Sequence, residues 1–272
     1  MDSGDVLDLA GHRVELSTPF KLKGGSVLRI SNGIISGHGH SLFQVSINRA
    51  GLLELRDVAL LHSRSPEREE KSSRGAALYA YRGRVNLLGC QIRSEGGFGV
   101  WSVQKAHITL TDCELRDTGR SAVVAFDASQ IDLDGTVVAN ATQHAICARG
   151  SSRVVVRRSR LERAELRAVY CYHSACLDMS DSVVSGTLSD EAAAVQVDAL
   201  RPGDSASLRM ERVTFDGNAG GDFAVCGNVE RHIGAEVRAV ERTEGVTHAA
   251  SSARIRDERR VDARGRLRTE QS

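Results

Sequence analysis

The most regular feature of the chain is an alternation of apolar and polar positions that returns every 23 residues. Each copy runs apolar, any, apolar, any, turn residue, small, any, apolar. Apolar residues at every second position predict a β-strand, because successive side chains of a strand point to opposite faces. The five copies that follow one another at this spacing start at Val85, Ile108, Ile131, Val154 and Leu177.

Looser copies extend the pattern towards both ends of the chain. In most repeats a second strand precedes the copy by about eight residues, with no helical stretch between them. Repetition at such a period is the signature of a solenoid, in which each unit stacks on its neighbours. We therefore predict an all-β, single-stranded parallel β-helix of about ten 23-residue coils over residues 5–240. The looser copies start at Leu7, Leu28, Leu53, Leu208 and, in a degraded form, Ile233.

This coil pattern resembles the right-handed parallel β-helices of the pectin-lyase-like superfamily. The superfamily includes pectate lyases, polygalacturonases and uronan epimerases, and also the non-enzymatic β-helices of F-box receptors and Shc-SH2-binding proteins. The regular coil without long decorated loops is more similar to the second group. The resemblance implies a right-handed coil, which is also the usual hand of crossovers between parallel strands.

Two segments depart from the period. Residues 62–74 form a charged insertion without apolar anchors, and this composition predicts a surface loop. From residue 241 to residue 272 the pattern dissolves into charged and small residues, which predicts a disordered or partly helical tail. The repeat begins at once, at Val6–Leu9, so no helical cap precedes it. Either the first coil is exposed or the chain is part of a larger polypeptide.

Composition limits the cellular compartment and the classes of partner that we expect for this protein. The net charge of +1 gives no global attraction to nucleic acid or to a membrane surface. The sequence shows no signal peptide and no apolar stretch long enough to span a bilayer, so we expect a cytoplasmic protein, with the nucleus also open. Among the six cysteines, Cys90 and Cys113 share one repeat position and should stack in the core as small apolar residues.

Aromatic residues concentrate on one outward strand face. All four tyrosines and the only tryptophan fall there, although aromatics make up just 4% of the chain. Contiguous exposed aromatic surface is typical of binding sites, so we predict that this face recognises a protein segment or, second, a glycan. Cover by the insertion or the tail is the alternative. The candidate binding residues are Tyr79, Tyr81, Trp101, Phe126, Arg149, Tyr170, Tyr172, His173 and Asp198.

The enzymatic alternative is a uronan lyase, hydrolase or epimerase that uses the same groove. Glycoside hydrolysis requires two carboxylates a few ångströms apart, whereas Asp127 and Asp198 fall three coils apart, roughly 14 Å. Gly37-His38-Gly39 matches a short polygalacturonase motif, but the aspartate motifs that precede it in that family are missing. Neither a nucleotide-binding nor a zinc motif occurs. We therefore predict a non-catalytic binding module without a metal or cofactor.

Overall fold

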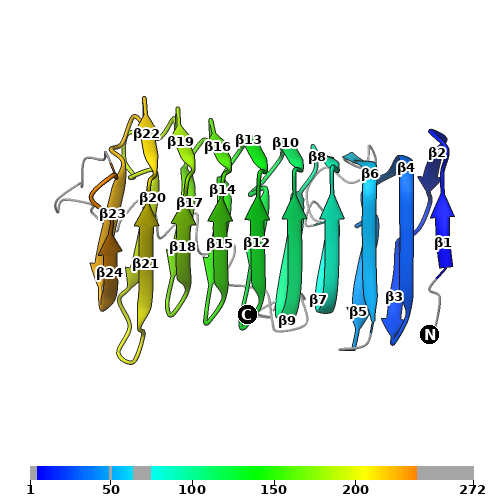
Figure 1. Cartoon of the computed structure of the whole chain (residues 1–272), viewed down its shortest axis with the longest axis horizontal. Helices are drawn as coiled ribbons and strands as arrows, with labels where there is room; N and C mark the ends of the chain where they lie inside the picture. Colours follow the sequence, from blue (N-terminus) through cyan, green and yellow to red (C-terminus); the bar gives the residue numbers. More distant parts are fainter. Residues whose placement is uncertain (1–4, 49–50, 64–74, 238–272) are drawn as a thin grey trace, which may run out of the picture. The chain divides into compact units, whose positions relative to one another are not determined.

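A computed structural model describes residues 5–48, 51–63 and 75–237 (Figure 1). Within these residues the chain forms 24 strands and no helix. The predicted tail at 241–272 lies outside the described residues, and so does most of the predicted insertion. Contacts group the chain into Met1–Arg242 and Thr243–Ser272, and all that follows concerns the first unit.

Each coil, one full turn of the solenoid, carries three strands that pair in parallel with the strands of the next coil. We call the sheets built in this way the first, second and third sheets, in the order in which a coil visits them. The first sheet contains the strand that precedes each repeat copy. It consists of β3 (Phe20–Gly24), β5 (Phe43–Ile47), the first part of β7 (Ala76–Leu88), the first part of β9 (Phe98–Thr111), β11 (Val123–Ala125), β14 (His144–Arg149), β17 (Arg167–Tyr172), β20 (Val195–Ala199) and β23 (Phe223–Gly227).

The second sheet contains the repeat copies themselves, and its ten strands enclose nine intervals, or about nine turns of the solenoid. It consists of β1 (Asp5–Asp8), the first parts of β4 (Val27–His38) and β6 (Leu52–Ser63), the second parts of β7 and β9, β12 (Gln130–Asp134), β15 (Arg153–Arg157), β18 (Cys176–Ser180), β21 (Ala206–Glu211) and β24 (Val229–Ile233).

The third sheet follows the turn residue of each copy. It consists of β2 (Arg13–Leu16), the second parts of β4 and β6, β8 (Gln91–Ser94), β10 (Glu114–Thr118), β13 (Val137–Ala141), β16 (Arg160–Glu162), β19 (Val183–Ser185) and β22 (Thr214–Asp216).

The core is a set of ladders formed by the inward positions of the three sheets. Ile108, Ile131, Val154 and Leu177 align from coil to coil and are at most 1% exposed, as the period predicts. Burying each such side chain contributes about 1.5–3 kcal/mol. The cysteine prediction is also confirmed, since Cys90 and Cys113 are both buried in the same core.

The corners between sheets use left-handed backbone. At the predicted turn position after the second sheet, φ is positive in every regular coil, which lets the chain bend sharply from the second sheet into the third within one residue. Glycine suits this conformation best, yet charged residues occupy several of these corners. The φ values are 50° at Asp112, 61° at Gly135, 47° at Arg158, 49° at Asp181 and 51° at Arg212.

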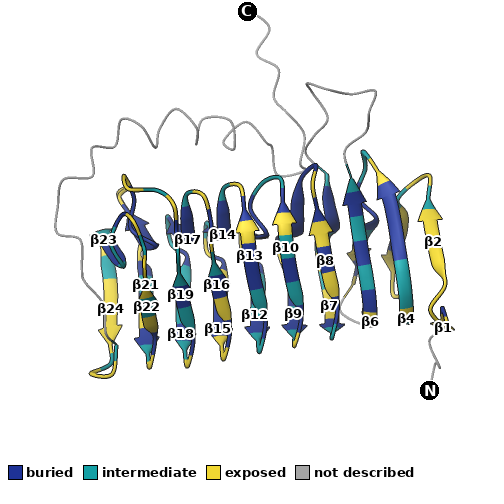
Figure 2. Ribbon diagram, turned by 90° about the horizontal axis from the view of Figure 1, so that it is seen from above, coloured by how far each residue is buried: buried dark blue, intermediate teal, exposed yellow. Residues whose placement is uncertain are grey.

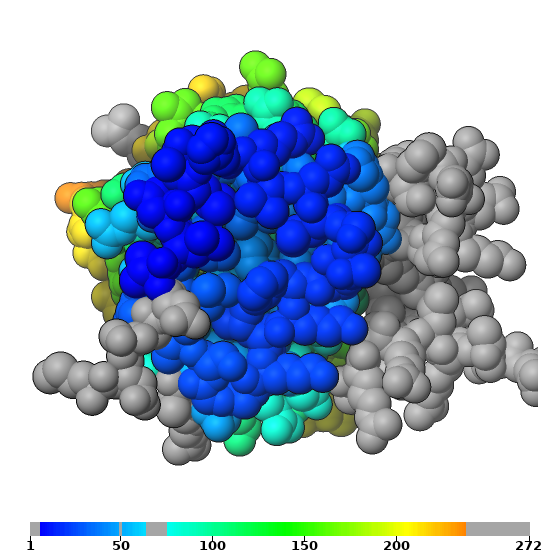
Figure 3. All heavy atoms as spheres, turned by 90° about the vertical axis from the view of Figure 1, so that its right-hand side faces the viewer, coloured from blue at the N-terminus to red at the C-terminus, as the bar shows by residue number. Residues whose placement is uncertain are grey.

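The two end strands correct the predicted register. The apolar pattern aligns Leu7 with Leu28 and Ile233 with Leu208, but Leu7 pairs with Ile30 and Ile233 with Met210. In both cases the true partner is 23 residues away. The described residues of β1 are exposed and β24 is largely exposed (β24 is mostly yellow in Figure 2), so burial does not enforce an apolar pattern there. The first coil presents exposed Val6, Leu7 and other apolar side chains at the end seen in Figure 3.

The start of the predicted insertion also needs correction. His62 and Ser63 belong to β6 and not to a loop. The His62 side chain is 3% exposed, and its Nδ1 lies 2.7 Å from Ser94 Oγ on the next coil. The strand therefore ends two residues later than the charged composition predicts. Residues 64–74 lie outside the described residues.

Candidate functional site

The outward positions of the first sheet line up as predicted. Tyr79, Trp101, Val124, Cys147 and Tyr170 are successive partners in the parallel ladder. None of them belongs to the main core cluster, which takes its members from the alternating inward positions. The aromatic residues therefore share one face of the first sheet.

The predicted exposure of this face is wrong for its largest side chains. Trp101, Tyr170 and Tyr172 are each 6% exposed, and Asp198 is 5% exposed. The accessible part of the face is smaller than predicted and carries the half-buried side chains. These are Tyr79, Tyr81, Phe126, Arg149 and His173.

Ring packing between neighbouring coils accounts for part of this burial. The Trp101 ring centroid lies 4.9 Å from that of Phe98, 5.5 Å from that of Tyr79 and 5.9 Å from that of Phe126. The contacts to Tyr79 and Phe126 are edge-to-face, the arrangement that the ring quadrupoles favour. Trp101 is thus the centre of an aromatic cluster that spans three coils.

A second cluster lies further along the same face. The Tyr170 and Tyr172 rings stack with centroids 5.0 Å apart, and His144 and His173 extend the stack on either side. The Arg149 guanidinium lies 5.8 Å from the centroids of both Phe126 and Tyr172. Arg149 therefore links the two aromatic clusters through cation–π contacts.

A buried polar network supports the second cluster. Arg167 Nε donates to Gln196 Oε1 at 2.7 Å, and Gln196 Nε2 donates to the Asp198 carboxylate at 3.1 Å. The Tyr170 hydroxyl donates to Asp198 Oδ2 at 3.0 Å. Asp198, predicted as a polar contact for a ligand, instead accepts hydrogen bonds from protein groups.

Burial determines the protonation states of the titratable side chains in the second cluster and its polar network. Desolvation, followed by the charge of Arg167, lowers the pKa of His144 to about 3, so its imidazole is neutral at physiological pH. Desolvation and the neighbouring Asp198 carboxylate raise the pKa of Tyr170, which keeps its phenol protonated as a donor. Desolvation also lowers the pKa of Arg167.

The sequence analysis missed His144, Arg167 and Gln196. His144 and Arg167 are partners in the first sheet, two residues before the inward Ile146 and Val169. Strict alternation gives both residues the parity of the inward positions, so a search of the outward positions does not find them. Gln196 was on the outward ladder but carries no aromatic signal.

The groups considered for catalysis do not converge. His38 of the Gly37-His38-Gly39 motif hydrogen-bonds to Ser63 Oγ and lies 3.1 Å from Glu15 Oε1. Asp127 Oδ2 accepts from Gln104 Nε2 at 3.3 Å and takes no part in the Asp198 network. Within the described residues, no group of three or more His, Cys, Asp or Glu could hold a metal ion.

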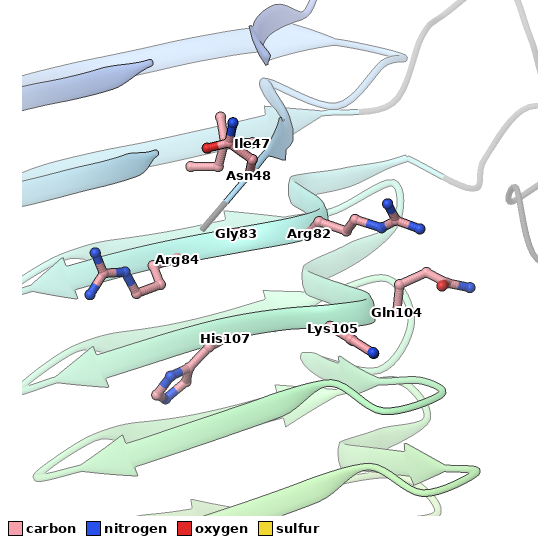
Figure 4. A pocket seen from close by; sticks show the side chains of 8 residues that line it. All are labelled: Ile47, Asn48, Arg82, Gly83, Arg84, Gln104, Lys105 and His107. Carbon is pink, nitrogen blue, oxygen red and sulfur yellow. The ribbon is translucent and has the colours of Figure 1, made fainter. Parts of the chain in front are cut away.

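A cationic cavity lies where the first sheet bends into the second. Its volume is about 660 Å³. Its walls come from three consecutive coils, at the end of β5 and the bends of β7 and β9 (Figure 4). The basic residues that line it recur 23 residues apart, as Arg82 with Lys105 and Arg84 with His107, but the sequence analysis followed the aromatic positions and did not single them out. The lining residues are Ile47, Asn48, Arg82, Gly83, Arg84, Gln104, Lys105 and His107.

Comparison with known families identifies the family to which the stack of coils belongs. The model of a family described as "right handed beta helix region" matches residues 45–200, more than half of the chain. The chain belongs to the right-handed β-helix family. The matched span of the β-helix runs from β5 to β20 and includes both the aromatic face and the cavity. No curated protein and no solved structure matches the chain.

Membership establishes the hand and the architecture of the β-helix and leaves its ligand open, because one fold hosts many functions. In the part of the chain that the structure describes, no helix has the length and apolar composition needed to cross a membrane.

Proposed function

We propose that this β-helix is a non-catalytic binding module that recognises an extended protein segment along the outward face of its first sheet. The observation that carries the proposal is the set of aromatic side chains on one face of β7, β9 and β17, together with Phe126 directly after β11. Strands in a sheet lie about 4.8 Å apart, so the face from Tyr79 to Tyr172 extends roughly 19 Å along the stack. An extended peptide of about six residues has this length.

The side chains of this face fall into two groups, a buried support layer and a half-buried contact layer that a ligand can reach. Trp101, Tyr170 and Tyr172 are buried and hold the surface rigid. Tyr79, Tyr81 and Phe126 are half-buried, so each ring presents an edge that a ligand can cover. Rigid aromatic side chains bind at low entropic cost and dominate many protein interfaces.

Arg149 and His173 supply polar recognition beside these rings. The Arg149 guanidinium makes no ion pair with any described residue and is held over two aromatic rings. It can therefore donate hydrogen bonds to backbone carbonyls or to an acidic side chain of the ligand. His173 Nδ1 lies 3.6 Å from Asp204 Oδ2, so its orientation is constrained by the loop after β20.

A second candidate, a polysaccharide-active enzyme, draws on the buried Arg167–Gln196–Asp198–Tyr170 network. Buried titratable groups with perturbed pKa values often mark active sites. Against this candidate, both Asp198 oxygens accept hydrogen bonds from Gln196 and Oδ2 also accepts one from Tyr170. Asp198 and Tyr170 are also at most 6% exposed, which leaves little room for a sugar ring. We expect no release of unsaturated uronate from alginate or polygalacturonate.

The proposal is tested by selecting peptides from a displayed random library on the full chain. Selected peptides should bind the wild type, and the double variant Tyr79→Ala/Phe126→Ala should bind them roughly tenfold more weakly or worse. The matched control is Phe20→Ala/Ile233→Ala, which removes exposed apolar side chains at the two ends of the stack. Equal binding by the face variant and the wild type, or failure to enrich any peptide, would contradict the proposal. Thermal melting of each variant confirms that it folds.

A further inference from the structure

The first coil leaves three strand edges open at the end of the stack. Within the described residues, β1, β2 and β3 each pair on one side only, with β4 or β5 of the following coil. An unpaired strand edge presents backbone N–H and C=O groups that can bind another strand. We call this end of the stack, which faces the viewer in Figure 3, the N-terminal edge.

The N-terminal edge also carries most of the exposed apolar surface. Four of the seven exposed large apolar side chains in the described part of the chain lie on it, at Val6, Leu7, Val14 and Phe20. Leu7, Val14 and Phe20 align with buried core residues of the second coil. They therefore continue the core ladders, and a further layer of strands would bury them.

The charges of the N-terminal edge are sorted by strand. Asp8 is exposed on β1, whereas Lys21 and Lys23 are exposed on β3, and β2 carries one charge of each sign, at Arg13 and Glu15. Charged side chains on an edge strand usually discourage pairing with another chain. Here an acidic, a mixed and a basic strand follow one another, so the edge is complementary to an inverted copy of itself.

We infer that the N-terminal edge binds a second copy of this chain about a twofold axis, with β1 against β3 of the second copy and β2 against its own counterpart. All three pairs are antiparallel in this arrangement. A twofold, isologous contact is the commonest kind between identical chains. The inference is independent of the proposed peptide recognition, because it uses the end of the stack and not the outward face of the first sheet.

The shape of a coil end fits this symmetry. A coil advances by about 4.8 Å along the stack, so its edge is a ramp on which β1 protrudes most and β3 least. A twofold axis through β2, perpendicular to the stack, sets the protruding β1 of each copy against the recessed β3 of the other. The spacing is then the same for all three strand pairs. Because a rotation preserves hand, the two stacks continue one right-handed coil.

The mixed strand β2 is self-complementary when Val14 lies opposite its own counterpart. Antiparallel pairing then sets Arg13 of each copy opposite Glu15 of the other, and cross-strand pairs of opposite charge are stabilising. Both side chains already contact the second coil. Arg13 Nε donates to Ser36 Oγ at 3.0 Å, and Glu15 Oε1 lies 3.1 Å from His38 Nε2. Their positions at the edge are therefore constrained before the second copy binds.

The acidic strand β1 matches the basic strand β3 in the same way. With the inward Leu7 opposite the inward Leu22 of the second copy, Asp8 lies opposite Lys21 on the outward side. Asp8 Oδ1 accepts a hydrogen bond from Asn32 Nδ2 at 3.2 Å, so the second coil also orients this carboxylate. The symmetry generates the pair twice, once on each side of the axis.

Head-to-tail stacking of identical chains fits less well. Continuation of the third sheet from the last coil of one copy to the first coil of the next would set Asp216 opposite Glu15, because both occupy the same column of the ladder. Like charges in opposite positions are destabilising. Such a contact would also repeat without closing and produce filaments, whereas the twofold contact closes at two copies.

Sedimentation equilibrium of the full chain over a wide range of concentrations tests the inference first. We expect a reversible equilibrium between monomer and dimer. A chain that stays monomeric at every concentration would overturn the inference. A series of species that grows beyond the dimer would overturn it as well, because that is the behaviour of head-to-tail stacking.

Charge reversal with mixing then tests the twofold pairing. Asp8→Lys and Lys21→Glu/Lys23→Glu should each dimerise roughly tenfold more weakly than the wild type, or worse. An equimolar mixture should recover the wild-type affinity. In the mixed dimer the reversed β1 meets the reversed β3, and the two unreversed strands meet each other. Absence of recovery from two variants whose thermal melting shows that they fold would contradict the pairing of β1 with β3.

Two further variants provide a control and an independent test. Arg56→Glu/Arg157→Glu reverses two exposed charges away from the N-terminal edge and should dimerise like the wild type. Val14→Asp sets like charges opposite one another at the centre of the interface and should weaken the dimer roughly tenfold or more. Equal weakening by the control, or an unchanged dimer in Val14→Asp, would overturn the inference.

Discussion

At the scale of single residues, the outward side of the first sheet behaves as a second, smaller core. Trp101 packs against three aromatic rings, Phe98 on its own strand and Tyr79 and Phe126 on the two neighbouring coils. Tyr170 combines a ring stack with a hydrogen bond to a buried carboxylate. The sequence predicts where these residues lie but not that they are buried, because burial depends on rings and polar partners from several coils packing together. Residues of this kind contribute to stability first and to recognition only through the surface that they support.

Replacement of Trp101 by alanine should therefore be strongly destabilising. We expect the free energy of unfolding to fall by about 3–5 kcal/mol, the usual cost of removing a buried large aromatic side chain. Tyr81→Ala, at a half-buried position of the same face, should cost clearly less. Chemical denaturation followed by circular dichroism measures both. A Trp101→Ala variant as stable as Tyr81→Ala would show that Trp101 is not a packing residue.

Buried His144 should make the stability of the protein depend on pH. Its pKa in the folded state is about 3, whereas an unfolded histidine titrates near 6.5. The stability that the neutral His144 contributes is complete above about pH 6.5. It is lost as pH falls towards 3, because in this range only the unfolded state takes up the proton. The expected slope is about 1.4 kcal/mol per pH unit. His62, with a pKa lowered to about 4 chiefly by burial, acts in the same direction.

Denaturant titrations at a series of pH values between 7 and 4 measure this slope. His144→Gln removes one titrating group, so its stability should fall less steeply with decreasing pH than that of the wild type. The slope and not the absolute stability is the readout, since glutamine changes packing as well. Identical slopes for the two proteins would rule out a buried neutral His144.

At the scale of strands and corners, the sequence predicts the interior of the stack well. Strands in the middle of the solenoid have neighbours on both sides, so burial forces their inward positions to be apolar and the period is visible. Strands β1 and β24 each have one neighbour in the second sheet, and the apolar pattern drifts by two residues there. The turn position in each copy predicts where the corners lie. It does not predict that arginine occupies some of them.

One arginine corner offers a test of backbone strain. Arg163 adopts a φ of 51° at a corner where the following coils have Gly186 and Gly217. Left-handed backbone costs a non-glycine residue about 1–2 kcal/mol, which exceeds the roughly 0.5–1 kcal/mol that glycine loses through unfolded-state entropy.

Arg163→Gly should therefore leave the free energy of unfolding unchanged or raise it by up to about 1 kcal/mol. The control, Arg157→Gly, places glycine at the last residue of strand β15, where φ is not positive and no strain is relieved, and should lower the free energy of unfolding by about 1 kcal/mol. Urea denaturation compares the two. A larger loss for Arg163→Gly than for Arg157→Gly would show that this corner is not strained.

At the scale of the whole stack, the period predicts the architecture, and the outward ladder predicts which face differs from the others. Two functional features remained beyond sequence reasoning. The contact layer is limited to the half-buried side chains, which requires knowing how the rings pack. The 23-residue period places the basic residues of β7 beside those of β9, but the cavity that they form with Ile47 follows only from the bend of β7 and β9 in three dimensions.

Photo-crosslinking tests most directly whether the aromatic face of the β-helix holds the ligand. Benzoylphenylalanine is placed at Phe126 in one full-length variant and at exposed Arg157, on the second sheet, in another. Each variant is then irradiated with a peptide selected on the wild-type protein. We expect covalent capture at position 126 and none at position 157. Capture at position 157 alone, or equal capture at the two positions, would contradict this expectation.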